Sequence, residues 1–263
     1  MIERVFSVFH KTLHPLLLII FRMIRKHQFD VLNEHPSLEG NAIYAVNHSN
    51  RYDIPYVCEA IRKQCYVLIG RQPLNLIDRM AFMLNGTVWV DRKDRADKKK
   101  ASAEMIKLLR KGNNVVIFPE GTWNLTPSKP LLPLYWGIID IAGTAEVPII
   151  PVIMEYTAKK CYISFGSPIK VTSPYDKNDQ INILADAMAS LKWKTWETCK
   201  DVGCKSLYEW NEEVERRIKE YPKLDYSYEC SVIRKEFTPF DELIDISKIS
   251  PNKYTAFLFR KDK

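Results

Sequence analysis

Residues 42–53 read AIYAVNHSNRYD, and this stretch indicates both a strand and a chemistry. Its first five residues are apolar or aromatic, which is typical of a short buried strand. His48 follows that strand, and Asp53 lies five residues later. A neutral imidazole can take a proton from a hydroxyl near pH 7, and a carboxylate on its other ring nitrogen orients it and stabilises the resulting charge. The pair can therefore activate an alcohol without an enzyme nucleophile, although a single histidine at a strand end is more often structural.

Three further segments accompany this motif. Downstream lie a β-branched strand that ends in Asp91 and Arg92, the run VVIFPEGT at residues 115–122, and the run VPIIPV at residues 147–152. In this order the four segments resemble the glycerolipid acyltransferase family, typified by 1-acyl-glycerol-3-phosphate acyltransferase. The blocks of that family are N-H-x-x-x-x-D, a strand closing in an arginine, F-P-E-G-T-R and V-P-I-x-P-V. The resemblance covers about residues 40–170.

Hydrophobic patterning predicts strands that alternate with helices. We expect strands at 42–46, 65–69, 87–90, 114–118, 149–155 and 160–165. We expect helices at 54–63, 77–84, 97–111, 136–144, 179–196 and 207–221, with Gly112 as a helix C-cap. This alternation predicts an α/β fold with a mixed, largely parallel sheet flanked by helices. Sites in such sheets lie at the carboxyl ends of the strands, and the His48 and Glu120 loops both follow strands directly.

We expect the chain to have three parts. Residues 1–30 are interpreted as membrane-associating helices, residues 31–172 as the acyltransferase core, and residues 173–263 as a helical extension packed on the core. In the first part, apolar residues recur at helical spacing between basic ones, and Pro15 splits the stretch into an amphipathic helix pair. The longest apolar run, Leu16–Phe21, is shorter than the roughly 20 residues that span a bilayer.

The charge of the chain favours an acidic partner. The formal net charge is +7, and the helix pair has basic flanks that suit the interface of an anionic leaflet. We therefore expect a peripheral or monotopic protein at the cytoplasmic face of the cell membrane, with an ordinary amphipathic helix as the alternative. The basic run from Arg92 to Lys100 is a solvated helix face, or it binds lipid head groups, coenzyme A or an acyl carrier protein. It lacks interleaved aromatic residues, so nucleic acid is not an expected partner.

The family resemblance implies the reaction and its residues. It implies transfer of a fatty acyl group from an acyl thioester to a lysophospholipid hydroxyl, foremost from 1-acyl-glycerol-3-phosphate to phosphatidic acid. His48 is the implied general base, and Asp53 orients it. The implied substrate-binding residues are Arg92 of the second block, the third-block residues Glu120, Gly121 and Thr122, and Arg71 near the start of the second block. No metal or bound cofactor is implied, and acyl-coenzyme A or acyl-acyl carrier protein is the co-substrate.

One position departs from the family pattern. Trp123 stands where the third block has an arginine that binds phosphate, and tryptophan offers one N–H and an apolar face but no charge. Either another basic residue such as Arg51 takes over phosphate binding, or the acceptor head group is not a bare phosphomonoester. The same chemistry on another lysolipid or hydroxylated lipid therefore stays open. A non-catalytic membrane-binding protein is the third hypothesis, and the intact pair of His48 and Asp53 argues against it.

Overall fold

The structure is a computed structural model of the whole chain. It describes residues 13–23, 27–50, 52–71, 79–80, 82–83, 86–124, 129–157, 159–172, 174–199, 202, 212, 215–216 and 219. The chain divides into two compact units, Met1–Leu224 and Asp225–Lys263, and every described residue belongs to the first. The expected helix at 207–221 therefore lies mostly outside the described residues.

A seven-stranded sheet forms the centre of the first unit. Its strands are β1 (Gln28–Val31), β2 (Ile43–Val46), β3 (Cys65–Gly70), β4 (Thr87–Val90), β5 (Asn114–Ile117), β6 (Ile149–Tyr156) and β7 (Lys160–Phe165). Their spatial order is β1-β7-β6-β2-β5-β3-β4. All neighbouring pairs are parallel except β6 and β7, which run antiparallel. The sheet is therefore mixed and largely parallel, as the alternation of strands and helices predicted.

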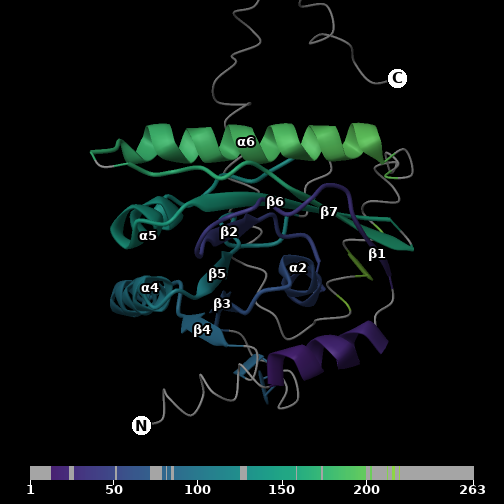
Figure 1. Cartoon of the computed structure of the whole chain (residues 1–263), viewed down its shortest axis with the longest axis horizontal. Coiled ribbons are helices and arrows are strands. Elements are labelled where there is room, and N and C mark those ends of the chain that lie inside the picture. Colours follow the sequence, from purple (N-terminus) through teal and green to yellow (C-terminus); the bar gives the residue numbers. More distant parts are fainter. Residues whose placement is uncertain are drawn as a thin grey trace, which may run out of the picture. The chain divides into compact units, whose positions relative to one another are not determined.

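Helices cover both faces of the sheet (Figure 1). One face packs against α4 (Arg95–Arg110), α5 (Gly137–Ala145) and α6 (Lys177–Thr198). The opposite face packs against α2 (Asp53–Ile61), and Leu18 and Phe21 of a helix at residues 13–23 contact the same apolar cluster. Because both faces of the sheet are covered, β2 and β5 are buried along their whole length, and their residues after Asn114 and from Ile43 onward are apolar or aromatic rather than alternating.

Local signals account for most of the element boundaries. The Asp94 side chain caps α4 by accepting a hydrogen bond from the Ala96 amide, and the Asp176 side chain caps α6 in the same way. Gly112 follows α4 with a φ of 82°, the left-handed conformation expected of a C-terminal glycine. The predicted strands from 65 to 165 and the helices at 54–63, 97–111, 136–144 and 179–196 are confirmed within a few residues. β1 was not predicted, and it lies across the expected boundary at residue 30.

The helix at residues 13–23 has one buried and one exposed side. Pro15 lies within this helix, which is continuous over the described residues 13–23. Arg22 Nε lies 2.8 Å from Oε1 of Glu59 in α2, which fixes the helix to the core. The apolar side chains that face outward are Leu16, Ile19, Ile20 and Met23, the last of them 81% exposed. Across the described residues, none of the helices has the length and apolar character to cross a bilayer.

Candidate active site

The carboxyl ends of four neighbouring strands meet at one edge of the sheet. β2, β5, β3 and β4 are mutually parallel neighbours, so the segments that follow them emerge side by side. β2 leads into His48, β5 into Glu120, β3 into Arg71 and β4 into Arg92. The topology thus brings residues from three family blocks to the same edge, although His48 is 44 positions from Arg92 and 72 positions from Glu120 in the sequence.

His48 and Asp53 form the pair that their spacing predicted. His48 Nδ1 lies 2.8 Å from Asp53 Oδ2. The Asp53 side chain is completely buried at the first residue of α2, whereas that of His48 is 18% exposed. The backbone amides of Ser49 and Asn50 also donate to Asp53 Oδ2, each at 2.8 Å. The orienting carboxylate is therefore enclosed and fixed, while the imidazole remains accessible.

Tyr156 supplies a fourth donor to Asp53 that the sequence analysis did not identify. Its hydroxyl lies at the end of β6 and donates to Asp53 Oδ1 over 2.7 Å. Burial and the neighbouring Asp53 carboxylate raise the pKa of Tyr156 well above its ordinary value, so the hydroxyl stays a donor. Both carboxylate oxygens are thus satisfied, as a buried charge requires.

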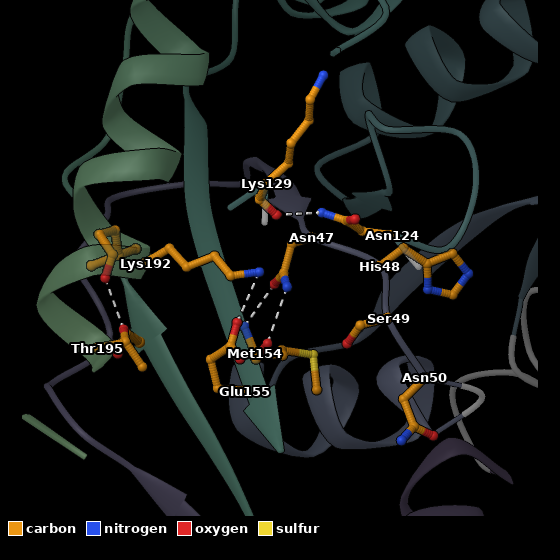
Figure 2. A network of polar contacts seen from close by, with 12 residues as sticks. Asn47, His48, Ser49, Asn50, Asn124, Lys129, Met154, Glu155, Lys192 and Thr195 are labelled. Atoms are coloured by element: carbon orange, nitrogen blue, oxygen red, sulfur yellow. Dashed lines mark hydrogen bonds and ion pairs between the residues drawn. The ribbon is translucent and has the colours of Figure 1, made fainter. Parts of the chain in front are cut away.

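Asn47 attaches the histidine loop to β6. Its side-chain amide donates to the Met154 carbonyl over 3.0 Å, and its side-chain oxygen accepts from the Met154 amide over 2.7 Å. Figure 2 shows this paired contact beside the loop that carries His48. The asparagine extends the pairing of β2 with β6 by one residue through its side chain, because the sheet ladder ends where the chain turns toward His48. The sequence motif contained Asn47, but no role could be assigned to it without β6.

Glu120 is a buried carboxylate in the loop after β5, and it bonds to the loop that carries His48. Its Oε1 accepts from the His48 amide over 3.0 Å and its Oε2 accepts from the Leu132 amide over 2.7 Å. Burial raises the pKa of Glu120 from 4.5 to about 7, against the lowering effect of both amides and of Lys192. The Asn124 amide also donates to the His48 carbonyl over 2.7 Å. Glu120 is only 1% exposed, and its carboxylate holds the His48 backbone.

Two aromatic rings flank the histidine. The Phe118 ring centroid lies 4.3 Å from that of His48, and the Trp123 centroid lies 5.9 Å away with its plane nearly perpendicular. Trp123 is the residue that stands in place of the arginine of the third block, so at this position the site has an aromatic ring beside the imidazole of His48 instead of a positive charge. The sequence showed the replacement, but only the structure shows that the indole adjoins the imidazole.

Arg92 lies against the backbone of β3. A Cβ placed on Gly70 would lie 2.7 Å from Arg92 Nε, so the glycine leaves room for the guanidinium. In the third block, the Tyr135 ring lies over Gly121, whose φ is 70°. Burial raises the pKa of Tyr135, and the positive charge of Arg92 opposes that rise.

The remaining predicted residues have different surroundings. The Arg71 side chain is 62% exposed, and its Nη2 lies 3.3 Å from Asp97 Oδ1 at the start of α4. Thr122 is 1% exposed, and its hydroxyl has no hydrogen-bond partner within the part of the chain that the structure describes. Arg51 lies outside the described residues. Among those described, no group of three or more His, Cys, Asp or Glu side chains could hold a metal ion.

Comparisons with known proteins agree with this arrangement. A family model described as acyltransferase matches residues 24–155. The 1-acyl-sn-glycerol-3-phosphate acyltransferases of Salmonella typhimurium and Escherichia coli are each 30% identical over 177 residues, covering 62% of this chain and 71% of the relative. The alpha form from Mus musculus is 33% identical over 156 residues, covering 54% of each chain.

A solved structure shows the same fold. The crystal structure of the 1-acyl-sn-glycerophosphate acyltransferase from Thermotoga maritima superposes with a TM-score of 0.53 at 18% identity, covering 73% of this chain and 80% of that one. The chain therefore belongs to the acyltransferase family, which confirms the resemblance drawn from the four sequence blocks. It is an enzyme of the acyltransferase class.

Proposed function

We propose that this enzyme transfers a fatty acyl group from an acyl thioester to the hydroxyl of a lysophospholipid, with His48 as the general base. The foremost acceptor is 1-acyl-glycerol-3-phosphate, which would yield phosphatidic acid, because the relatives above carry that substrate in their names. The observation that carries the proposal is the contact of His48 Nδ1 with the enclosed carboxylate of Asp53.

The contact between His48 Nδ1 and Asp53 determines which ring nitrogen can accept a proton from the substrate. A carboxylate accepts hydrogen bonds, so it selects the imidazole tautomer with the proton on Nδ1 and leaves the lone pair on Nε2. Nε2 would take the proton of the acceptor hydroxyl while the oxygen attacks the thioester carbon. The C–O bond then forms, the C–S bond breaks, and the proton passes from Nε2 to the departing thiolate. Such general-base catalysis contributes roughly 100- to 10,000-fold in rate.

Binding of the acceptor would involve the edge around the third block. Arg92 is a candidate partner for its phosphate because a guanidinium can form two parallel charge-assisted hydrogen bonds. Gly121 and the buried hydroxyl of Thr122 lie in the loop that follows β5, at the same edge of the sheet. Arg71 would have to leave Asp97 to take part.

A second acceptor class is favoured by one observation. The ring centroids of Trp123 and His48 lie 5.9 Å apart, and Trp123 occupies the position at which the family has a phosphate-binding arginine. A lysolipid with a substituted phosphate, or a hydroxylated lipid, would meet an apolar edge there without losing an ion pair. The chemistry at His48 would be the same for either acceptor.

The donor would be an acyl group on coenzyme A or on an acyl carrier protein. Support comes from the exposed basic residues Lys93, Arg95, Lys98, Lys99 and Lys100 at the start of α4. They follow β4 at the same sheet edge as the site, so they can attract the phosphates of coenzyme A or the acidic surface of a carrier protein.

The helix at residues 13–23 would place the enzyme on the cytoplasmic face of the cell membrane. Its four outward apolar side chains suit an interfacial helix, which lies in the plane of the leaflet. Flotation with anionic vesicles tests this part. We expect Ile19→Glu with Met23→Glu to leave the protein unbound, whereas equal binding by this variant would contradict the membrane role.

Acyl transfer in mixed micelles tests the reaction. Labelled acyl-coenzyme A is supplied with lysophosphatidic acid, and wild type is compared with His48→Ala and with His35→Ala. His35 contacts Tyr44 rather than the site, so it controls for the loss of a histidine ring. We expect transfer by wild type and by His35→Ala, and a fall of about 100-fold or more in His48→Ala. Undiminished transfer by His48→Ala would refute the base, and absent transfer by wild type would direct the assay to carrier-protein donors and other lysolipids.

A further inference from the structure

A lysine occupies a core position of α6. The residues of α6 that are buried against the sheet are Leu184, Met188, Lys192 and Thr195, which recur at the spacing of one helical face. The side chain of Lys192 is only 8% exposed. A buried ammonium is costly unless it is paired, so an apolar residue is the ordinary occupant of such a position. Lys192 also lies beyond residues 24–155, the segment that the family model matches.

The partners of Lys192 lie at the carboxyl end of β6. Its Nζ is 2.9 Å from Glu155 Oε1, and the Glu155 side chain is itself 15% exposed. Nζ also lies 5.4 Å from the ring centroid of Trp196, within range of a cation–π contact. One turn along, Thr195 Oγ1 lies 2.8 Å from Ser164 Oγ in β7. These contacts hold the last turns of α6 to β6 and β7.

Glu155 stands between the two residues of β6 that hold the catalytic pair. Met154 bonds through its backbone to Asn47, and Tyr156 donates through its hydroxyl to Asp53. Successive side chains of a strand point to opposite faces, so Glu155 faces α6 whereas Tyr156 faces α2. Figure 2 shows Lys192 and Asn47 reaching the same stretch of β6. The ion pair thus fixes, from the far face, the segment on which Asn47 and Asp53 depend.

Lys192 also acts on the carboxylate that links the two loops. Glu120 is buried, and its charged form is favoured by the amides of Leu132 and His48 and by the positive charge of Lys192, while Asp53 disfavours it. The positive charge of Lys192 therefore forms an ion pair with Glu155 and also lowers the pKa of Glu120. Removing it would leave Glu155 without its ion-pair partner and would raise the pKa of Glu120 further.

We propose that Lys192 is a positioning residue of the active site: it holds the carboxyl end of β6 through Glu155 and balances the charge of the Glu120 carboxylate between the two site loops. This inference rests on the proposed function for its kinetic test, which requires acyl transfer, but not for the infrared test. Its competitor is a purely stabilising ion pair, which could be replaced by apolar residues with no effect on the site.

Infrared titration of the full-length protein separates the two without any substrate. The C=O stretch of the protonated Glu120 carboxyl is identified by its absence in Glu120→Gln, and its midpoint is compared in wild type, Lys192→Met, Lys192→Arg and Glu155→Gln. We expect Lys192→Met to raise the midpoint by about one pH unit or more, the effect of removing a nearby opposite charge. Lys192→Arg keeps the wild-type midpoint. Glu155→Gln removes a negative charge, so we do not expect it to raise the Glu120 midpoint.

Kinetics tests the positioning of the loop. We expect the acidic limb of kcat/KM for acyl transfer to move to higher pH in Lys192→Met together with the infrared midpoint. At alkaline pH, where Glu120 is ionised in each variant, we expect kcat to remain lowered by about tenfold with KM little changed, and Lys192→Arg to restore it.

An unchanged Glu120 midpoint in Lys192→Met would overturn the inference, even if the variant melted at a lower temperature. If Lys192→Met does not fold, the same comparison is made with Lys192→Met/Glu155→Met, which leaves no unpaired ion of this pair in the core. Absent transfer by wild type would count against the proposed function alone, because the infrared result does not depend on the substrate.

Discussion

Glu120 is expected to make the stability of the fold depend on pH. The carboxyl is 1% exposed and bonds to the amides of His48 and Leu132, yet burial raises its pKa from 4.5 to about 7. Replacing it by glutamine keeps the size of the side chain and removes the titration. The variant also offers only one acceptor oxygen to the two amides, so one of them loses its partner.

The magnitude follows from these two effects. The lost acceptor lowers the free energy of unfolding by about 1–3 kcal/mol at every pH. The interval between 4.5 and about 7, at about 1.4 kcal/mol for each pH unit, corresponds to about 3 kcal/mol. In that interval the folded protein holds a proton on Glu120 that the unfolded chain has released. Stability from this group is therefore complete below pH 4.5 and is lost as the pH rises through about 7.

Urea denaturation of wild type and Glu120→Gln between about pH 5 and about pH 8 measures this difference. We expect the free energy of unfolding of wild type to exceed that of the variant most at low pH. This difference should shrink by up to about 3 kcal/mol as the pH rises. Glu104→Gln is the matched control, because the Glu104 side chain is 42% exposed on α4 and its Oε2 lies 4.0 Å from Lys107 Nζ. A difference between wild type and Glu120→Gln that stays constant over this range would refute the reasoning.

Three further predictions concern the catalytic pair and the acceptor. Asp53→Asn is expected to lower kcat by about 100-fold or more, because the imidazolium loses its counter-charge; steady-state kinetics would show near wild-type rates if the carboxylate were only structural. Tyr156→Phe is expected to lower the free energy of unfolding by about 1.5–3 kcal/mol in urea titrations, since Asp53 Oδ1 loses its donor, and an unchanged value would contradict the contact. Trp123→Arg is expected to lower KM for lysophosphatidic acid by about tenfold relative to lysophosphatidylcholine, and equal effects on both would rule out a role in head-group choice.

Short-range signals made much of this site predictable. His48 and Asp53 are five residues apart, so the turn between β2 and α2 can bring them together without help from the rest of the chain. Arg92 and Glu120 could be assigned to the same edge because parallel strands carry their following loops on one side. The replacement at Trp123 was likewise visible in the sequence alone.

Other contacts could not be predicted because they join distant segments. Tyr156 reaches Asp53 across 103 positions and Asn47 reaches Met154 across 107. Both depend on β6 lying next to β2 on the side away from β5, a strand order that no local pattern encodes. The ion pair of Arg71 with Asp97 in α4 is likewise a contact that only the fold shows, whereas substrate binding by Arg71 stays a prediction.

The sequence by itself determined the family and the fold class, because its four ordered blocks and the apolar periodicity of its α/β layers are local features of the chain. It also placed a histidine and a carboxylate five residues apart after a strand. Tertiary structure alone decided how that pair is held. Asn47 and Asp53 each bond to a residue of β6, and Glu120 bonds to the amide of Leu132 as well as to that of His48. The physical reason is that buried charges must be satisfied by whichever donors the packing brings near, and packing is a property of the whole fold.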